Sequence, residues 1–400
     1  MTLTEETLRF IRKHLDDDVR HLALQARKYP AVDMPTAITQ IAGHQVAGIK
    51  VPTWADKEGI LYPLHLSLEQ CSSEITARYK AELIANSATR HDTFTDLTGG
   101  FGIDCSFISA CFKQATYVER QKALCEIASH NFPLLDLPQL TVCHDDSVQY
   151  LQTMSPVDWI FIDPARRDGK GGKTVAISDC EPDVSALETL LLEKAQHVLV
   201  KLSPMLDLTL AIHDLKHVQE VHIVSAHNEC KELLLVLGHD ESLSTEEVPI
   251  HCINLTSAQS PQSFTFTRQQ EKDSACNYAS TLKAYLYEPN ASLLKAGAFR
   301  CISSAYGVEK LHPNSHLYTS DSYLPDFPGR KFHIVNSCGF SKNEIKEMLG
   351  TEKKANLTVR NFPASVAELR KRLKLAEGGN IYLFATTLVN EKKVLIACQP

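Results

Sequence analysis

The stretch Phe94-Thr-Asp-Leu-Thr-Gly-Gly-Phe-Gly-Ile-Asp104 decides the fold of this chain. It predicts a strand, a tight glycine turn and then a helix. Gly99, Gly100 and Gly102 have no side chains where the backbone must bend sharply and where a ligand must come close. The spacing is not Gly-x-Gly-x-x-Gly, and Asp96 ahead of the glycines would repel a phosphate, so a dinucleotide site is a poor fit. The acid suits a cationic ligand with an amino-acid end.

Strands and helices alternate from about residue 90 onward. This alternation predicts a parallel sheet with helices on both faces. The last two apolar runs, Val221–Ser225 and Glu232–Leu237, are separated only by a short polar turn, so these two strands must be antiparallel. The five earlier strands are expected at His91–Leu97, Ala115–Glu119, Leu140–Cys143, Trp159–Asp163 and His197–Leu202.

Acidic residues close the first three strands of this pattern. Asp96 ends the first, and Glu119 ends the second, 119 − 96 = 23 residues later. Asp145 and Asp146 follow the third. Ligands of such sheets bind beyond the carboxyl ends of the strands, so these carboxylates are expected around one pocket. Taken singly, each acid could equally be a solvated loop residue.

Five parallel strands that end in a reversed hairpin, over residues 67–238, resemble the class I S-adenosylmethionine (SAM) methyltransferases. The resemblance implies an α/β fold with a Rossmann-like seven-stranded sheet, and SAM as cofactor. It implies that Glu119 holds the ribose hydroxyls and that Asp146, or else Asp145, contacts the adenine amino group. The cofactor residues that it implies are Asp96, Thr98, Gly99, Gly100, Gly102, Glu119, Asp146 and Asp163.

The methyl group in this family faces the end of the fourth strand, here Asp163-Pro-Ala-Arg166. This motif is similar to that of RNA 5-methyluridine methyltransferases. Those enzymes attack the base with a cysteine after the fifth strand, where this chain has Lys201-Leu-Ser-Pro204, so covalent carbon methylation is disfavoured. Guanine-N2 and adenine-N6 methyltransferases carry (Asn/Asp)-Pro-Pro-aromatic instead, and Ala165 and Arg166 depart from that pattern.

A third resemblance is to the Lys-Asp-Lys-Glu tetrad of RNA ribose 2′-O-methyltransferases. It implies a catalytic set of Lys80, Asp163, Lys201 and Glu232. In such a set, one lysine lowers the pKa of the other, which can then deprotonate a hydroxyl. The alternative is that both lysines are surface charges and that Glu232 is a strand-edge charge.

Arg166 and its neighbour Arg167 suit a phosphate or a negatively charged base edge. Salt bridges to Asp158 or Asp168 are the alternative. The segment Asp168–Thr174 is rich in glycine and lysine and is a candidate lid over the substrate.

Four domains are expected along the chain. Helical spacing of apolar residues in the first sixty residues predicts an N-terminal helical domain, 1–64, followed by an extended approach at Leu61–Leu68 and a helix at Glu74–Ala85. The methyltransferase domain is expected at 65–240, and 239–261 is interpreted as a connector or irregular strands. Residues 262–330, with Asp326-Phe-Pro-Gly-Arg330, resemble a ferredoxin-like domain. Residues 331–400, with Asn361-Phe-Pro363, resemble the THUMP-like domain of bacterial SAM methyltransferases.

The net charge of −7 is distributed unevenly. Residues 326–400 hold 13 Lys/Arg and 7 Asp/Glu, so they carry +6, and the remainder carries −7 − 6 = −13. A positive module on a negative body indicates contact with a phosphate backbone, so RNA is the expected partner. The best candidates are Arg360, Arg370, Lys371, Arg372 and Lys374, although these could also form a solvated helix face.

Composition excludes several other classes. No apolar run is long enough to span a bilayer, and the N-terminus has no apolar core of the signal-peptide kind. The twelve cysteines form no Cys-x-x-Cys pair, so we expect no metal, no disulfide framework and a cytoplasmic location. The sequence thus predicts a methyltransferase that acts on RNA, at a base or at the ribose. The alternatives are a methyltransferase for small molecules or proteins, and a SAM-binding RNA module without turnover.

Overall fold

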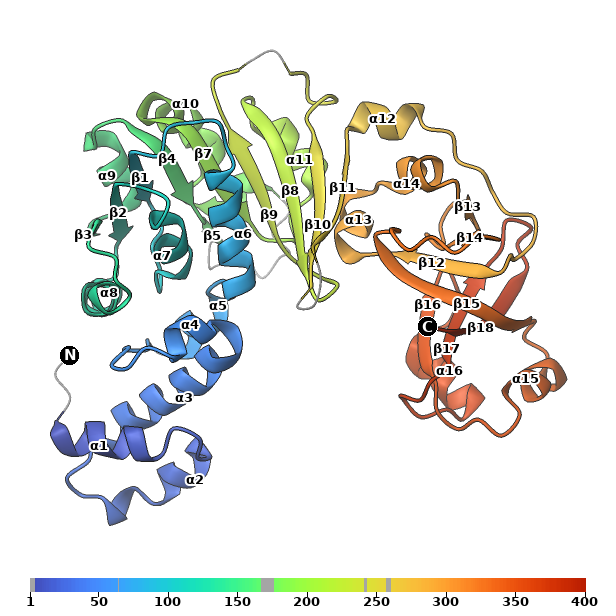
Figure 1. The fold of residues 1–400 in the computed structure, drawn as a ribbon, viewed down its shortest axis with the longest axis horizontal. Coiled ribbons are helices and arrows are strands. Elements are labelled where there is room, and N and C mark those ends of the chain that lie inside the picture. The colour runs from blue at the N-terminus through green and yellow to red at the C-terminus, as the bar shows by residue number, and fades with distance from the viewer. Residues whose placement is uncertain (1–3, 64, 167–175, 241–242, 257–259) are drawn as a thin grey trace. The chain divides into compact units, whose positions relative to one another are not determined.

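The computed structural model describes residues 4–63, 65–166, 176–240, 243–256 and 260–400, with the side chains of 65–67 and 166 outside the described part. The chain forms two compact units (Figure 1). The first unit comprises Met1–Gln219 and Glu232–Ser242, and the second comprises Glu220–Lys231 and Leu243–Pro400.

The first unit begins with short helices. Thr4, Asp18 and Asp33 cap three of them by accepting hydrogen bonds from backbone N–H groups. These helices enclose a small apolar core around Phe10 and Ile41. The elements are α1 (Glu5–Lys13), α2 (Val19–Leu24), η1 (Ala26–Lys28), α3 (Met34–Lys50), α4 (Pro52–Ala55), α5 (His65–Gln70) and α6 (Glu74–Ala85).

Two helices lead from this segment to the sheet. The helix predicted at Glu74–Ala85 is α6. The extended segment predicted at Leu61–Leu68 is wrong in its second half, because α5 begins at His65. Pro63 favours an extended backbone only for the residue before it, and it does not prevent a helix that starts beyond it.

The sheet of the first unit has the strand order β9-β7-β4-β1-β2-β3. The first five strands along the chain are parallel to their neighbours, and β9 is antiparallel to β7. The predicted α/β sheet with a reversed last strand is therefore confirmed. The strands are β1 (Thr93–Asp96), β2 (Gln114–Glu119), β3 (Leu140–His144), β4 (Val157–Ile162), β7 (Ala195–Leu202) and β9 (Glu229–Leu237).

Connections between these strands are mostly helical, as a parallel sheet requires. The central strands are rich in buried apolar side chains such as Phe161, Val198 and Leu235. The connecting elements are α7 (Ile103–Ser109), α8 (Lys122–Leu134), α9 (Ser147–Thr153), the small pair β5 (Ala165–Arg166) and β6 (Cys180–Glu181), η2 (Ile177–Asp179), α10 (Val184–Lys194) and α11 (Leu208–Asp214).

A two-residue turn connects β8 (Val218–Ala226) to β9. His227 and Asn228 form this turn, and both have positive φ angles of 51° and 63°. Two central residues with positive φ are typical of a tight hairpin connection. The predicted short polar turn between the last two strands is confirmed.

The second unit contains two groups of strands. In the first, β10 (Ile250–Leu255) is parallel to β8 and β11 (Gln262–Phe266) is antiparallel to β10. The interpretation of 239–261 as a connector or irregular strands thus missed the regular strand β10. The second group is a seven-stranded sheet of order β13-β14-β12-β15-β18-β17-β16. Its strands are β12 (Tyr285–Pro289), β13 (Glu309–Lys310), β14 (Tyr318–Ser320), β15 (Gly329–Cys338), β16 (Asn356–Arg360), β17 (Tyr382–Thr387) and β18 (Lys393–Gln399).

Five helices complete the described part of the second unit. Asn290 caps α13 by accepting from the backbone N–H of Leu293. The sequence analysis missed α14. The helices are α12 (Arg268–Asp273), α13 (Ala291–Ala296), α14 (Phe299–Tyr306), α15 (Lys342–Leu349) and α16 (Val366–Leu373).

Candidate active site

A cavity of about 300 Å³ lies in the first unit beyond the carboxyl ends of β1, β2, β4 and β7. This is the edge at which parallel sheets bind ligands, and the volume is at the lower end of the range for small-molecule sites. Every residue that the methyltransferase resemblance assigned to the cofactor lines this cavity, and so does Lys201. The cofactor residues are Asp96, Thr98, Gly99, Gly100, Gly102, Glu119, Asp146 and Asp163.

The glycine turn between β1 and α7 has no room for side chains. A Cβ atom on Gly99 would lie 2.2 Å from Cε2 of Tyr117, and one on Gly102 would lie 2.9 Å from Cζ of Phe132. Gly102 also has a φ of 90°, which a residue with a side chain rarely adopts. Glycine is therefore required by packing at Gly99 and by both packing and conformation at Gly102.

Asp96 is only 1% exposed at the end of β1. One of its carboxylate oxygens accepts a hydrogen bond from the Thr98 backbone N–H at 2.9 Å. Burial raises the pKa of Asp96 well above its usual value, and the nearby carboxylates of Asp104 and Asp163 raise it further. A cationic group placed beside Asp96 would reverse this effect and favour the ionised carboxylate.

Glu119 at the end of β2 stabilises the glycine turn through hydrogen bonds. Its Oε2 accepts from the Gly100 backbone N–H at 3.0 Å, and its Oε1 accepts from the Gln121 N–H at 2.7 Å. Each carboxylate oxygen can accept more than one hydrogen bond. Glu119 can therefore hold the turn and still accept from a ligand in the cavity.

Asp146 caps α9 after β3. Its Oδ1 accepts from the backbone N–H groups of Val148 at 2.9 Å and Gln149 at 3.2 Å. Asp145 accepts from the Asp146 N–H at 2.8 Å and does not line the cavity among the described residues. Of the two alternatives, the structure thus favours Asp146 as the residue that faces a ligand.

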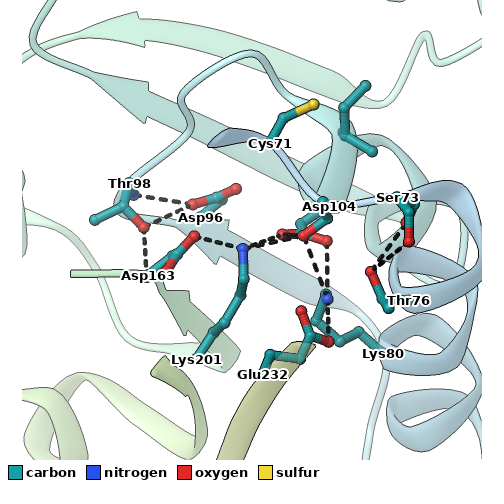
Figure 2. A network of polar contacts seen from close by, with 12 residues as sticks. Cys71, Ser73, Thr76, Lys80, Asp96, Thr98, Asp104, Asp163, Lys201 and Glu232 are labelled. Atoms are coloured by element: carbon teal, nitrogen blue, oxygen red, sulfur yellow. Dashed lines mark hydrogen bonds and ion pairs between the residues drawn. The ribbon is translucent and has the colours of Figure 1, made fainter. Parts of the chain in front are cut away.

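Figure 2 shows the four residues of the predicted tetrad in one network of ion pairs. Lys80 Nζ lies 2.5 Å from Glu232 Oε1, and Lys201 Nζ lies 2.6 Å from Asp163 Oδ2. Lys80 is 0% exposed and Glu232 is 3% exposed. The alternative interpretation, in which these lysines are surface charges and Glu232 is a strand-edge charge, is therefore wrong.

A fifth residue, Asp104, joins the two halves of this network. Its two carboxylate oxygens lie 3.2 Å from Nζ of Lys80 and 3.2 Å from Nζ of Lys201. The Ser72 hydroxyl donates to Asp104 at 2.7 Å, and Lys201 donates to that hydroxyl at 3.0 Å. The sequence analysis quoted Asp104 as the end of its first motif but gave it no role. In the first turn of α7, an acid has an ordinary explanation in the helix dipole.

The electrostatics of this network contradict one prediction. Burial disfavours the charged form of Lys201, but Asp104, Asp163 and Glu232 outweigh it and raise the pKa of Lys201 well above its usual value. At Lys201 the shift is therefore opposite to the predicted lowering by a neighbouring lysine, because Asp104 lies between the two ammonium groups. Burial raises the pKa of Glu232 and so favours its neutral, protonated form. This reduces the negative charge in a network that has more carboxyl groups than lysines.

Arg166 is described only by its backbone, which pairs with Cys180 in β5–β6. Arg167 and the lid candidate Asp168–Thr174 lie outside the described residues. Asp158, proposed as an alternative partner for these arginines, accepts hydrogen bonds from the backbone N–H groups of Asp92 and Thr93. Asp158 thus has a role in joining β4 to the start of β1.

The basic residues of the C-terminal module differ in their surroundings. Arg370 donates to the Ala355 carbonyl and pairs with Glu377. Arg372 donates to the Phe340 carbonyl and lies over its ring, and Arg360 pairs with the buried carboxylate of Glu288 at 2.8 Å. Lys371 and Lys374 are exposed. These two lysines are the members of the predicted set that a phosphate backbone can reach most easily.

The fold and the cavity define a Rossmann-like α/β domain of the methyltransferase type, followed by a ferredoxin-like and a THUMP-like module. Residues 285–328 match the family described as a ferredoxin-like domain, and residues 329–400 match that of THUMP domain-like proteins. A crystal structure of a "putative methyltransferase" from Porphyromonas gingivalis W83 is 36% identical, covers 100% of this chain and 99% of its own, and has a TM-score of 0.88. This chain belongs to the same family.

More distant structures are also similar. An RNA methyltransferase described as "putative", PH1948 from Pyrococcus horikoshii, is 16% identical over 38% of this chain and 70% of its own, with a TM-score of 0.28. TrmK from M. capricolum, solved with S-adenosyl-homocysteine, is 9% identical over 42% and 73%, with a TM-score of 0.32. These scores carry no argument about this chain. Among curated proteins, none is significantly similar in sequence.

Among the helices within the described ranges, none has both the length and the apolar character needed to cross a bilayer.

Proposed function

We propose that this protein is a SAM-dependent methyltransferase that acts on RNA. The observation that carries the proposal is the convergence of Asp96, Glu119 and Asp146 on one cavity, with the glycine turn between them. A buried carboxylate suits the cationic end of SAM, a carboxylate that can accept two hydrogen bonds suits the ribose hydroxyls, and a third suits the adenine amino group.

SAM, when bound, supplies an electrophilic methyl group. Asp163 is the member of the charged network that a substrate reaches most easily, because 37% of its side chain is exposed, against 12% for Lys201. Lys201, held as an ammonium ion, orients Asp163 and can donate a hydrogen bond to a substrate oxygen. Lys80 is fully buried, so its role is to position Glu232 and Asp104 rather than to contact the substrate. Arg166 remains a candidate for a phosphate contact.

RNA is the proposed substrate because the positive charge of the chain is concentrated in residues 326–400. The methylated position, a base or the ribose, stays open. A lysine base that deprotonates a ribose hydroxyl is disfavoured, because the pKa of Lys201 is raised and not lowered. A methyltransferase for small molecules or proteins and a SAM-binding RNA module without turnover are the rival functions.

Transfer of tritium from methyl-labelled SAM separates these functions. The purified full chain is incubated with total RNA from cells that lack the protein, with and without RNase, and with protein extract. Label that becomes acid-soluble after RNase treatment supports the proposal. Label that survives RNase supports a protein or small-molecule substrate, and tight SAM binding without transfer supports the binding module. Asp163→Asn should abolish transfer and leave the RNA affinity unchanged.

The RNA surface is tested separately by charge reversal. Lys371→Glu with Lys374→Glu should weaken RNA binding and reduce the slope of log K against log salt by about 1 per lysine. The matched control, Lys392→Glu with Lys393→Glu, makes the same charge change at other exposed positions of the same module. Equal losses in both double variants would show that net charge alone, and not this face, governs binding.

A further inference from the structure

Three side chains with metal-ligating atoms lie on one face of the strand pair β8–β10 in the second unit. Glu220 and His222 are two residues apart on β8, so they point to the same face. His251 lies directly opposite His222 in the parallel register with β10. The two imidazole rings stack with centroids 4.5 Å apart. The three ligand atoms all lie within 4.8 Å of one another.

Two distances within this group, each from a histidine Nε2 atom to a carboxylate oxygen of Glu220, can be compared with those in metal sites. His222 Nε2 lies 3.6 Å from Glu220 Oε1, and His251 Nε2 lies 3.4 Å from Glu220 Oε2. Both separations exceed the usual length of an N–H···O hydrogen bond, about 2.7–3.2 Å. Two ligands at about 2.05 Å from a tetrahedral Zn²⁺ ion are separated by about 3.3–3.4 Å. Each imidazole Nε2 therefore lies at close to this separation from one carboxylate oxygen of Glu220.

A further contact orients one of the imidazoles. His251 Nδ1 lies 2.9 Å from the hydroxyl of Thr265, which is directly opposite His251 on β11. With Nδ1 donating to this hydroxyl, Nε2 keeps the lone pair that a metal requires. Histidine ligands of metals commonly have such a partner on their other ring nitrogen.

We propose that Glu220, His222 and His251 bind a divalent transition-metal ion such as Zn²⁺, with solvent in the remaining position. Two imidazole nitrogens and one carboxylate suit Zn²⁺, whereas Mg²⁺ and Ca²⁺ prefer oxygen ligands. The side chains of Glu220 and His251 are 35% and 25% exposed, whereas the Nε2 atoms of His222 and His251 are themselves buried. The ion would join β8 to β10.

No metal was expected from the sequence, because its cysteines form no Cys-x-x-Cys pair. The ligands here come from two strands that are separated by many residues along the chain. Only the parallel register of β8 and β10 brings His222 and His251 together.

The test uses the full chain without an affinity tag, after treatment with a chelator. Isothermal titration with Zn²⁺ should give saturable binding of one ion per chain, and Mg²⁺ should give none. Co²⁺ should give the visible absorption of a site with nitrogen and oxygen ligands. Thr265→Val should weaken Zn²⁺ binding by about 10–100-fold, and His251→Ala should weaken it further.

His333→Gln is the matched control, since it removes an exposed histidine outside the group. It should bind Zn²⁺ like the wild type. Circular dichroism of the metal-free proteins verifies that each variant is folded, and Glu220→Gln provides a nearly isosteric second variant if His251→Ala is not. The proposal is overturned if the wild type binds no stoichiometric Zn²⁺, or if Glu220→Gln and Thr265→Val bind it as tightly as His333→Gln does.

Discussion

Replacement of Asp104 by asparagine removes the charge that joins Lys80 to Lys201 and almost nothing else. The side chain keeps its size, so packing around α7 changes little. An asparagine can still accept the hydrogen bond from Ser72, but its amide nitrogen cannot accept from an ammonium group. The substitution therefore measures the electrostatic contribution of Asp104 to the stability of the first unit.

The magnitude follows from the pKa of this carboxyl. Burial alone would raise it, but Lys201 and Lys80 lower the pKa of Asp104 from 3.8 to about 2. At about 1.4 kcal/mol per pH unit, this corresponds to about 2 kcal/mol of stability. A carboxyl with a lowered pKa stabilises the folded state fully above its unfolded pKa. The contribution is lost as the pH falls from about 4 through about 2.

Tryptophan fluorescence measures this effect without interference from the second unit. The chain has two tryptophans, Trp54 and Trp159, and both are buried in the first unit. Urea denaturation at pH 7 should show that Asp104→Asn lowers the free energy of unfolding by about 2 kcal/mol. The difference from the wild type should decrease below about pH 4.

Asp136→Asn is the control for this experiment. Asp136 pairs with Lys57 at 2.9 Å, but their side chains are 83% and 46% exposed. Loss of this ion pair should therefore lower the free energy of unfolding by less than about 1 kcal/mol. If Asp104→Asn and Asp136→Asn have equal effects, or if the effect of Asp104→Asn does not depend on pH, then Asp104 does not hold the lysines electrostatically.

Three further predictions concern other parts of the chain. Gly99→Ala should reduce SAM affinity at least tenfold and lower the free energy of unfolding by about 1–3 kcal/mol, because the added Cβ would overlap the Tyr117 ring. Calorimetry measures the affinity, and urea denaturation measures the stability. SAM binding should release a proton from Asp96, whose pKa is raised in the empty site, so the affinity should increase with pH; calorimetry in buffers of different ionisation enthalpy detects the proton. Glu288→Gln should lower the free energy of unfolding by about 3–5 kcal/mol and accelerate hydrogen exchange in β12, since this 2% exposed carboxylate pairs with two arginines.

The parts of the fold that local signals determine could be predicted from the sequence. The glycine turn after Asp96 and the two-residue turn at His227 are short-range features of the sequence. The helix Glu74–Ala85 was also located correctly, because its apolar spacing and its preceding serines are local signals. By contrast, β10 has the polar flanks of a connector, and only its pairing with β8 makes it a strand.

The candidate site was predictable as a set of strand ends but not as an electrostatic network. Lys80 and Glu232 could be selected only through a resemblance, since nothing local distinguishes them from surface charges. Asp104 was missed because an acid in the first turn of a helix is ordinary. Its role depends on the tertiary position of Lys201, which is far away in the sequence. Similarly, the sequence could not separate the exposed Lys371 from Arg370, which contacts its own module.

The charge balance of the cavity explains which ligands it can accept. Lys201, Asp104, Asp163 and Asp96 line the cavity, and Lys80 and Glu232 join them from behind through Asp104. The lysines pair with Asp104, Asp163 and Glu232, and among the described residues no lysine is in ion-pair contact with Asp96. Buried carboxyl groups in excess cannot all ionise, which is why the pKa values of Asp96 and Glu232 are raised. An anionic cofactor would worsen this imbalance. A sulfonium and an ammonium group would correct it, so the charge pattern that limits ionisation in the cavity supports the proposal that SAM is the cofactor.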